Sequence, residues 1–214
     1  MRYALEPVRD FSATPTLSNR VVVLEQLGHH HLEELIRAAA VDELWRRWYV
    51  TVPAPEAMVE DVDRRLAEQR DGLSASWAIL APATGRAVGM TSFHSFDPAH
   101  KRLEIGRTWI AADLHGSGVN PAVKILQLAR AFEVLAVHAV ELRANWHNHP
   151  SRQAIERLGA KQDGVLRKHR IQPDGTVRDT VVYSITDDEW PAVKLTLMDR
   201  LYRRYGPEVL EPVA

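Results

Sequence analysis

The 214-residue sequence contains no cysteine. This excludes disulfide bonds, thiolate-bound zinc and a cysteine nucleophile from the chain itself. No apolar run approaches the roughly 18 residues that a membrane-spanning helix needs, and no N-terminal stretch joins basic residues, an apolar core and a cleavage site. We therefore expect a cytoplasmic protein without a membrane partner.

The sequence also has no large excess of positive or negative charge. The formal net charge is -1, with 26% charged and 45% hydrophobic residues. This gives no electrostatic basis for binding nucleic acid, and the composition is ordinary for a globular protein. The length fits one domain. We predict an irregular lead-in at 1–19, a single domain at 20–205 and a tail at 206–214.

Apolar periodicity predicts an α+β protein. A strand at 21–27 and helices at 31–41 and 55–71 precede three strand-like runs at 76–80, 87–95 and 103–110. Turn residues separate these three runs, which predicts an antiparallel meander. The remaining expected elements are a helix at 121–136, a strand at 139–143, a helix at 151–158, strands at 165–171 and 177–185 around a turn at 172–175, and a helix after a capping box at 186–189.

A glycine-punctuated turn, His115-Gly116-Ser117-Gly118-Val119, lies between the third run and the next helix. Glycines permit the positive φ values that turn successive backbone N–H groups toward an anion. Asn120 is expected to cap the helix with Pro121 in its first position, and Lys124 lies one turn further on the same face. The segment predicts a phosphate cradle; the alternatives are a helix start without a ligand and a solvated Lys124.

Four motifs occur in a fixed order along the chain. They are Glu104-Ile105-Gly106, Gly116-Ser117-Gly118-Val119-Asn120 with Lys124, Asn148-x-x-Ser151, and Leu158-Gly159-Ala160 followed by Gly164. With the order of helices and strands, this set resembles the GNAT superfamily of acyl-CoA-dependent N-acyltransferases, in particular the RimJ/RimL branch. The resemblance implies a mixed, splayed sheet flanked by helices, with a C-terminal helix extension and CoA between two diverging parallel strands.

The resemblance also implies a donor site. Backbone amides of His115, Gly116, Ser117, Gly118 and Val119 are expected to bind the CoA pyrophosphate, with Asn120 and Lys124 as supplements. Asn148 matches the residue that contacts the pantetheine arm, and Ser151 matches a hydroxyl one turn later. The chain departs from the family pattern at Asp113, where Gln or Arg is usual, and at Ile155, where many members carry a tyrosine general acid.

Catalytic roles follow from the same resemblance. Glu104 corresponds to a general base that often acts through water, and a backbone N–H near Trp109 or Ile110 corresponds to the oxyanion donor. Strand alternation places Glu104, Gly106, Thr108 and Ile110 on one face and Leu103, Ile105, Arg107 and Trp109 on the other. Because Ile155 replaces the tyrosine, Ser151 or a bound water is expected to protonate the thiolate, unless the thiolate leaves unassisted. Two alternatives stay open: Glu104 pairs with a basic residue of a neighbouring strand, and Ser151 only caps its helix.

Aromatic residues are expected to form the acceptor wall. Trp45, Trp48 and Tyr49 can enclose an amine through cation–π contacts, although core packing accounts for at least one tryptophan. Arg167, His169 and the turn at 172–175 would close the cleft from the other side.

The histidine triplets His29-His30-His31 and His147-Asn148-His149 invite a metal interpretation. Adjacent residues of an extended segment point in opposite directions, and no ligand spacing recurs nearby. We expect no functional metal.

The predicted function is direct transfer of an acyl group, preferably acetyl, from acyl-CoA to a primary amine of a protein N-terminus or a small molecule. Two alternatives are a CoA-binding or partner-binding module with weak or no catalysis, and a larger donor such as succinyl-CoA. The sequence leaves open the acceptor and the choice between a monomer and a homodimer.

Overall fold

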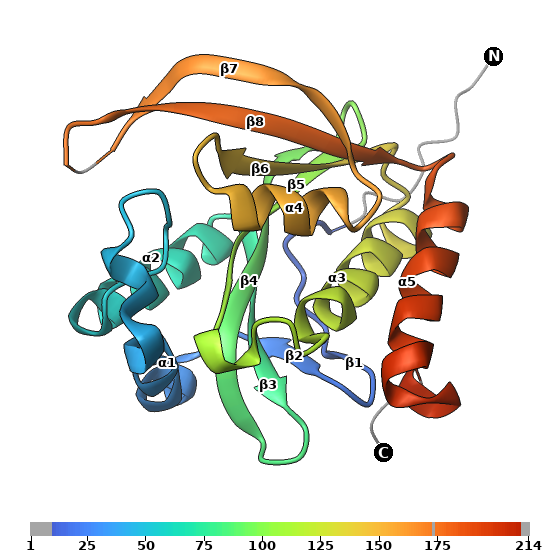
Figure 1. Ribbon diagram of the computed structural model, residues 1–214, viewed down its shortest axis with the longest axis horizontal. Coiled ribbons are helices and arrows are strands. Elements are labelled where there is room, and N and C mark those ends of the chain that lie inside the picture. The colour runs from blue at the N-terminus through green and yellow to red at the C-terminus, as the bar shows by residue number, and fades with distance from the viewer. Residues whose placement is uncertain (1–9, 173, 211–214) are drawn as a thin grey trace.

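The computed structural model describes residues 10–172 and 174–210. Their backbone forms one eight-stranded sheet with the order β1-β2-β3-β4-β5-β6-β8-β7, and helices lie on both of its faces (Figure 1). The strands are β1 (Leu17–Ser18), β2 (Val23–Gln26), β3 (Ser74–Ala81), β4 (Arg86–Asp97), β5 (Arg102–Ile110), β6 (Ala139–Asn145), β7 (Lys161–Ile171) and β8 (Val177–Thr186). The helices are α1 (Leu32–Ala40), α2 (Met58–Arg70), α3 (Val119–Ala129), α4 (His149–Glu156) and α5 (Trp190–Tyr205).

The predicted α+β class and the antiparallel meander of β3, β4 and β5 are confirmed. The structure adds the short strand β1 within the predicted lead-in, and Phe11 joins the hydrophobic core. The helix predicted at 121–136 begins at Val119 and ends in a π-helical turn at Arg130–Val134. Residues 1–9, Pro173 of the predicted hairpin turn and residues 211–214 of the predicted tail lie outside the described residues.

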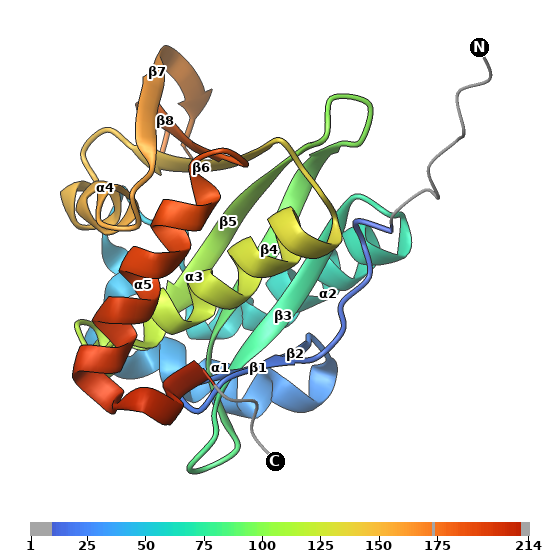
Figure 2. The same ribbon diagram turned by 90° about the vertical axis from the view of Figure 1, so that its right-hand side faces the viewer.

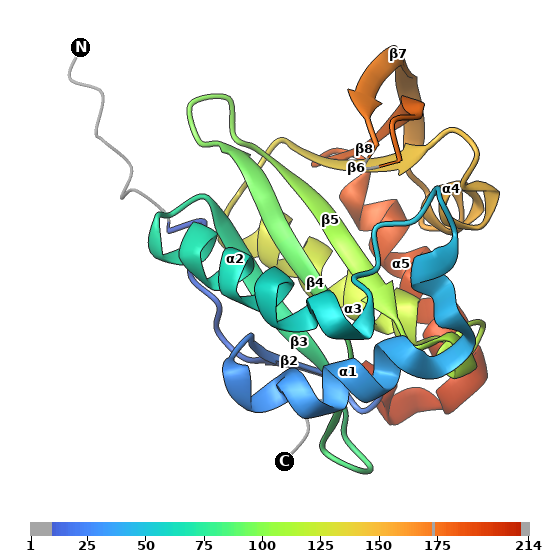
Figure 3. The same cartoon turned by 90° about the vertical axis from the view of Figure 1, so that its left-hand side faces the viewer.

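Two helical layers enclose the sheet. Helices α1 and α2 cover one face of β3, β4 and β5 (Figure 3), and α3 and α5 lie on the opposite face (Figure 2). The larger apolar cluster includes Leu103 and Ile105 of β5, Val123 of α3 and Leu197 of α5. A smaller cluster joins α1 and α2 to Trp109. Burying each large apolar side chain contributes about 1.5–3 kcal/mol, so the two clusters hold the helices on the sheet.

The sheet splays between β5 and β6. These parallel strands pair only at Arg102 with Ala139, Leu103 with Val140, and Glu104 with Glu141. Beyond Glu104 the strands diverge, and their facing peptide groups have no strand partner there. The predicted crossover through α3, with parallel flanking strands, is therefore confirmed.

A β-bulge in β5 corrects the expected side-chain alternation. Ser92 pairs with Gly106 and Met90 with Trp109, so two residues of β5 lie opposite Thr91. Arg107 occupies the bulge with a φ of 51°. The extra residue exchanges the two faces beyond it: Thr108 turns toward α3, and Trp109 packs against the α1–α2 cluster. The prediction that Thr108 and Ile110 share the face of Glu104 is wrong for this reason.

The last helix closes the fold near the glycine turn. The Glu189 carboxylate accepts a hydrogen bond of 3.1 Å from the Thr186 amide, which is one half of the predicted capping box. At the other end of α5, the Tyr205 hydroxyl donates to the Ser117 carbonyl. None of the described helices is long and apolar enough to cross a membrane.

Candidate active site

A cleft of about 930 Å³ passes through the splay. Its walls include the ends of β5 and β6 that do not pair with each other, and the glycine turn. One side of α4, the end of α5 and the loop after α1 complete them. On the α3 side it reaches Gly116, Gly118 and Asn120, and on the α1–α2 side it reaches Tyr49 and Arg107. The cleft therefore connects the two faces of the sheet.

The glycine turn presents unused backbone donors at the start of α3. Gly118 occupies the N-cap position with a φ of 97°. The Val119 amide donates to the Ser117 hydroxyl over 3.3 Å. The amides of Gly116, Gly118 and Asn120 have no hydrogen-bond acceptor among the described residues. Such donors at a helix N-terminus suit an anion.

The expected capping arrangement is wrong in detail. Because Gly118 adopts the left-handed conformation, α3 begins at Val119, and Asn120 is its second residue rather than its cap. His115 lies beside the turn, where its Nε2 is 3.1 Å from the Ile110 carbonyl oxygen. This contact joins the turn to the end of β5.

Lys124 does not face the turn. Its side chain is buried, and the ammonium donates to the Thr108 hydroxyl and the Gln127 amide oxygen, each over 2.9 Å, and to the Thr91 hydroxyl over 3.4 Å. Burial lowers the pKa of this ammonium to about 7. Lys124 and Thr108 both line the cleft, but the ammonium is held by Thr108 and Gln127, so Lys124 links α3 to the bulged strand rather than presenting an unpaired cation to the turn as expected.

Arginines of the C-terminal helix supply the positive charge near the turn instead. Arg200, Arg203 and Arg204 line this end of the cleft. A Cβ atom built on Gly118 would lie 2.9 Å from the Arg204 Cδ and from two atoms of Tyr205. Sequence reasoning missed these arginines because only the packing of α5 brings them to the turn, although three basic residues in five positions were a visible signal.

The start of α4 forms another wall. Asn148 is the N-cap, and its Oδ1 accepts a hydrogen bond of 3.1 Å from the Ser151 amide. The alternative that Ser151 caps the helix is therefore wrong. The Ser151 hydroxyl forms no hydrogen bond with another described residue, and both side chains line the cleft together with Ile155.

Glu104 sits where β5 and β6 separate. Its carboxylate is 3.4 Å from the Arg143 Nε and 3.8 Å from the His94 Nε2. Burial raises the pKa of Glu104, although the Arg143 guanidinium opposes this shift. The residue is only 7% exposed and lies behind the cleft wall, next to Ile105 and Arg143, which do line it. The expected pairing with a basic residue of a neighbouring strand is thus present.

His94 stays uncharged beside this carboxylate. Burial and the nearby cations Arg107 and Arg65 lower the pKa of its imidazole to about 3. The ring lies over Gly106, where a Cβ atom would come within 2.4 Å of its Nε2. The absence of a side chain at Gly106 therefore leaves room for the His94 ring.

Asn145 at the end of β6 is a site residue that sequence reasoning missed. It lines the cleft and is 2% exposed, and its Oδ1 accepts from the His147 amide over 3.0 Å. Its amide nitrogen has no hydrogen-bond partner among the described residues. An unpaired buried donor is costly unless a ligand or water satisfies it. The available signal was a polar residue that ends an otherwise apolar strand.

The sequence model of the Acetyltransferase (GNAT) domain matches residues 22–161, which is more than half of the chain. This chain belongs to the GNAT acetyltransferase family. The Bacillus subtilis (strain 168) protein YdaF, provisionally named a ribosomal N-acetyltransferase, is 34% identical over 110 residues. That match spans 51% of this chain and 59% of YdaF, so the chain aligns with just over half of this relative.

Solved GNAT structures share the fold over most of their length. A T. thermophilus protein provisionally described as an acetyltransferase is 38% identical, with a TM-score of 0.77 over 89% of this chain and 99% of that one. A GCN5-related N-acetyltransferase from Brucella melitensis is 28% identical, with a TM-score of 0.81 over 91% and 89%. Mycobacterium smegmatis RimJ in complex with CoA-disulfide is 22% identical, with a TM-score of 0.75 over 88% and 96%. At 22% identity the RimJ structure shows a shared fold, and the membership of this chain in the GNAT family rests on the domain match.

Of the expected acceptor wall, Tyr49 lines the GNAT cleft and the tryptophans do not. Trp48 is exposed, with its ring centroid 5.1 Å from that of His147, and Trp45 is half-buried beneath Arg46. The expected closing residues also lie outside the lining: exposed Arg167 pairs with Asp179, and His169 contacts the Thr180 hydroxyl over 3.1 Å. The sequence pattern of a strand does not show whether its side chains point into the cleft or away from it.

The described residues include one group with metal-ligand side chains in proximity. Atoms of Glu25, His30 and His31 lie within 4.8 Å of one another, because the histidines occupy a 3₁₀ turn and do not alternate as expected. The His31 Nδ1 accepts from the Gly28 amide, so its Nε2 carries the proton and faces the Glu25 carboxylate at 3.5 Å. This geometry is that of a hydrogen-bonded cluster.

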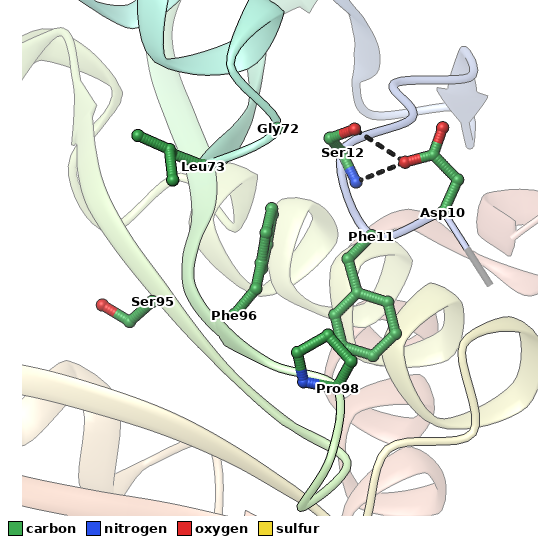
Figure 4. Close-up of a pocket in the computed structure, with 8 residues that line it drawn as sticks. All are labelled: Asp10, Phe11, Ser12, Gly72, Leu73, Ser95, Phe96 and Pro98. Atoms are coloured by element: carbon green, nitrogen blue, oxygen red, sulfur yellow. Dashed lines mark hydrogen bonds between the residues drawn. The ribbon is translucent and has the colours of Figure 1, made fainter. Parts of the chain in front are cut away.

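A second hollow lies away from the cleft. It has a volume of about 640 Å³ and is lined by Phe11, Phe96 and Pro98 with neighbouring residues (Figure 4). Asp10 also lines this hollow, and its carboxylate accepts hydrogen bonds from the amide and hydroxyl of Ser12. These internal hydrogen bonds and the apolar rings give it no arrangement suited to group transfer.

Proposed function

We propose that this GNAT protein transfers an acetyl group from acetyl-CoA to a primary amine of a protein N-terminus or a small molecule. The cleft through the splay carries this proposal, because it joins the unused amides at the start of α3 to the Glu104 region on the opposite face. A donor and an acceptor that enter from opposite faces would meet between β5 and β6. The attack is direct, without a covalent enzyme intermediate.

The donor enters from the α3 side. The amides of Gly116, Gly118 and Asn120 bind the CoA pyrophosphate, and Arg203 and Arg204 add charge compensation. The pantetheine arm runs between the diverging strands, where Asn145 and Asn148 provide amide groups. Mycobacterium smegmatis RimJ, which shares the fold, is in complex with CoA-disulfide, and this supports a CoA compound as the donor.

The acceptor amine meets the thioester near Glu104. The carboxylate takes the ammonium proton through water, which its position behind the cleft wall requires. The amine nitrogen bonds to the carbonyl carbon, and backbone donors near Trp109 and Ile110 stabilise the oxyanion. The carbon–sulfur bond then breaks, and the second proton of the amine nitrogen passes to the departing thiolate through the Ser151 hydroxyl or a water.

CoA release with a panel of peptides and small amines tests the proposal. We expect release that depends on both acetyl-CoA and an amine, with the acetylated amine identified by mass spectrometry. CoA binding by calorimetry serves as the control for folded protein. Tight CoA binding without transfer to any amine would contradict the proposal and favour the CoA-binding module.

Two further expectations stay predictions. A cytoplasmic location is one, and a monomeric or homodimeric state is the other. Light scattering on the purified chain determines the oligomeric state directly.

A further inference from the structure

Two arginines face each other on the hairpin beside the cleft. Arg170 of β7 and Arg178 of β8 are paired residues of the antiparallel ladder, so their side chains lie on the same face. Like charges directly opposite each other destabilise a sheet unless an anion lies between or beside them. Arg170 is exposed to solvent, whereas Arg178 is half-buried, so compensation by an anion matters most at Arg178.

Protein groups do not provide that compensation among the described residues. The Arg178 Nε donates to the Thr180 hydroxyl over 3.0 Å, and no described carboxylate lies within 4.0 Å of its guanidinium. Arg170 forms no ion pair or hydrogen bond through its side chain with another described residue. Arg178 is half-buried and lines the cleft, which places its guanidinium where a ligand can reach it.

Arg143 extends this positive region toward the reaction centre. It pairs with Val182 of β8, and alternation along β8 places Arg178, Thr180 and Val182 on one face. Its guanidinium already contacts Glu104 and Glu141. Arg107 also lines the cleft and is paired with Glu68. The acceptor face thus holds more guanidinium groups than carboxylates free to neutralise them.

The pKa values of neighbouring groups reflect the same charge excess. Besides burial, four arginines lower the pKa of His94, namely Arg107, Arg65, Arg143 and Arg170. Burial and then Arg170 lower the pKa of Arg178 itself. A positive potential of this kind disfavours polyamines and aminoglycosides, because like charges repel in a partly buried site.

We propose that Arg178, with Arg143 beside it, forms a carboxylate-binding subsite on the acceptor face of the cleft. The subsite rests on the proposed acyl transfer and specifies its substrate class: one of the two reacting molecules carries a carboxylate near the reacting atoms. The guanidinium fork binds carboxylates with two parallel hydrogen bonds. Two sources fit this chemistry: an acceptor with a carboxylate close to its amine, or a dicarboxylic acyl group such as succinyl on CoA.

Matched pairs of probes distinguish the two sources. For the acceptor, the pairs are L-alanine with L-alaninamide, and a tetrapeptide beginning with Asp with its Asn counterpart. For the donor, the pair is succinyl-CoA with acetyl-CoA. The variant is Arg178→Gln, and Arg37→Gln on exposed α1 is the control for loss of one positive charge.

In the acceptor case, R178Q should lower kcat/KM for the carboxylate probes about 10- to 100-fold and leave the amide probes within about threefold. The change should appear in KM for the acceptor, with KM for acetyl-CoA unaltered. In the donor case, R178Q should weaken calorimetric binding of succinyl-CoA by a similar factor and leave acetyl-CoA binding unchanged. Arg178→Lys should restore only part of the loss, because lysine keeps the charge and lacks the fork.

The calorimetric arms keep this test separate from the proposed function. Binding of succinyl-CoA, and of the amine probes to CoA-saturated protein, requires no turnover. Charge-dependent binding without transfer would support the subsite and contradict the proposed activity. Equal effects of R178Q on both members of every pair, or no effect on any, would overturn the subsite whatever the activity.

Discussion

The proposed donor and acceptor sides of the cleft are built in different ways. On the donor side, Gly116, Gly118 and Asn120 provide unused backbone amides at one helix start. On the acceptor side, single side chains come from separate elements: Glu104 from β5, Arg143 from β6 and Arg178 from β8. One side is a local motif, whereas the other exists only after the sheet forms.

This difference indicates how each side can vary. A backbone cradle depends on glycine conformations and the helix start, so it tolerates few changes within the turn. A side-chain site changes its preference by single substitutions on strands whose backbone stays fixed. The proposed donor site is therefore recognisable from the sequence, whereas the proposed choice of substrate depends on single residues such as Arg178. Four predictions test this contrast, beginning with the largest expected effect.

Glu104→Gln should affect the acceptor side alone. Loss of the base is expected to lower kcat about 100-fold or more, while calorimetric CoA affinity changes less than about twofold. Because burial raises the pKa of Glu104, kcat/KM of the native protein should rise with pH through that elevated pKa. The variant should lose this rise. Full activity across pH in E104Q would show that another group is the base.

Gly118→Ala should affect the donor side and not the acceptor side. A left-handed φ costs a residue with a Cβ about 1–2 kcal/mol, and this Cβ would also collide with Arg204 and Tyr205. We expect roughly tenfold weaker CoA binding and lower stability. Gly116→Ala is the matched control, since its φ of 74° is also positive but no atom lies within 4 Å of the built Cβ. Equal losses in both variants would refute a role for the α5 contact.

Lys124→Met should alter stability rather than either side of the cleft. The ammonium pKa is about 7 in the folded state against 10.5 ordinarily, so the unfolded chain binds more protons between these values. The free energy of unfolding of the native protein should therefore rise with pH in this range, by up to about 1.4 kcal/mol per unit. Urea unfolding at pH 7.5 and 9 measures this slope, which K124M should lack.

The accompanying CoA titration gives Lys124 a second test. Because its ammonium donates to Thr108 and Gln127, CoA affinity should change less than about threefold in K124M. A larger loss would restore the interpretation of Lys124 as a phosphate ligand.

Ser151→Ala should have the smallest effect. The Asn148 cap bonds to the Ser151 amide, which the variant keeps, so the start of α4 should remain intact. A water can replace the hydroxyl as proton donor to the thiolate, so kcat should fall about tenfold or less. Single-turnover kinetics isolates this step. A fall beyond that range would make Ser151 the required acid.

The sequence predicted most of the fold because its signals are local. Alternation and turn residues located β3, β4 and β5, and the glycine turn located the start of α3 to within two residues. The bulge at Arg107 was not predictable from alternation, since an added residue leaves no trace in an apolar–polar pattern. It determined which residues of β5 face α3.

The candidate site also combines features that local sequence predicts with features that it does not. The sequence by itself determined the glycine turn and the helix start that follows it, because neighbouring residues set both; the caps Gly118 and Asn148 appeared only in the structure. Only the tertiary structure decided the rest: it buried Lys124, paired Glu104 with Arg143, and brought Arg178 to the cleft. The physical reason is that burial and charge pairing depend on strands far apart in the chain, which come together only when the sheet assembles.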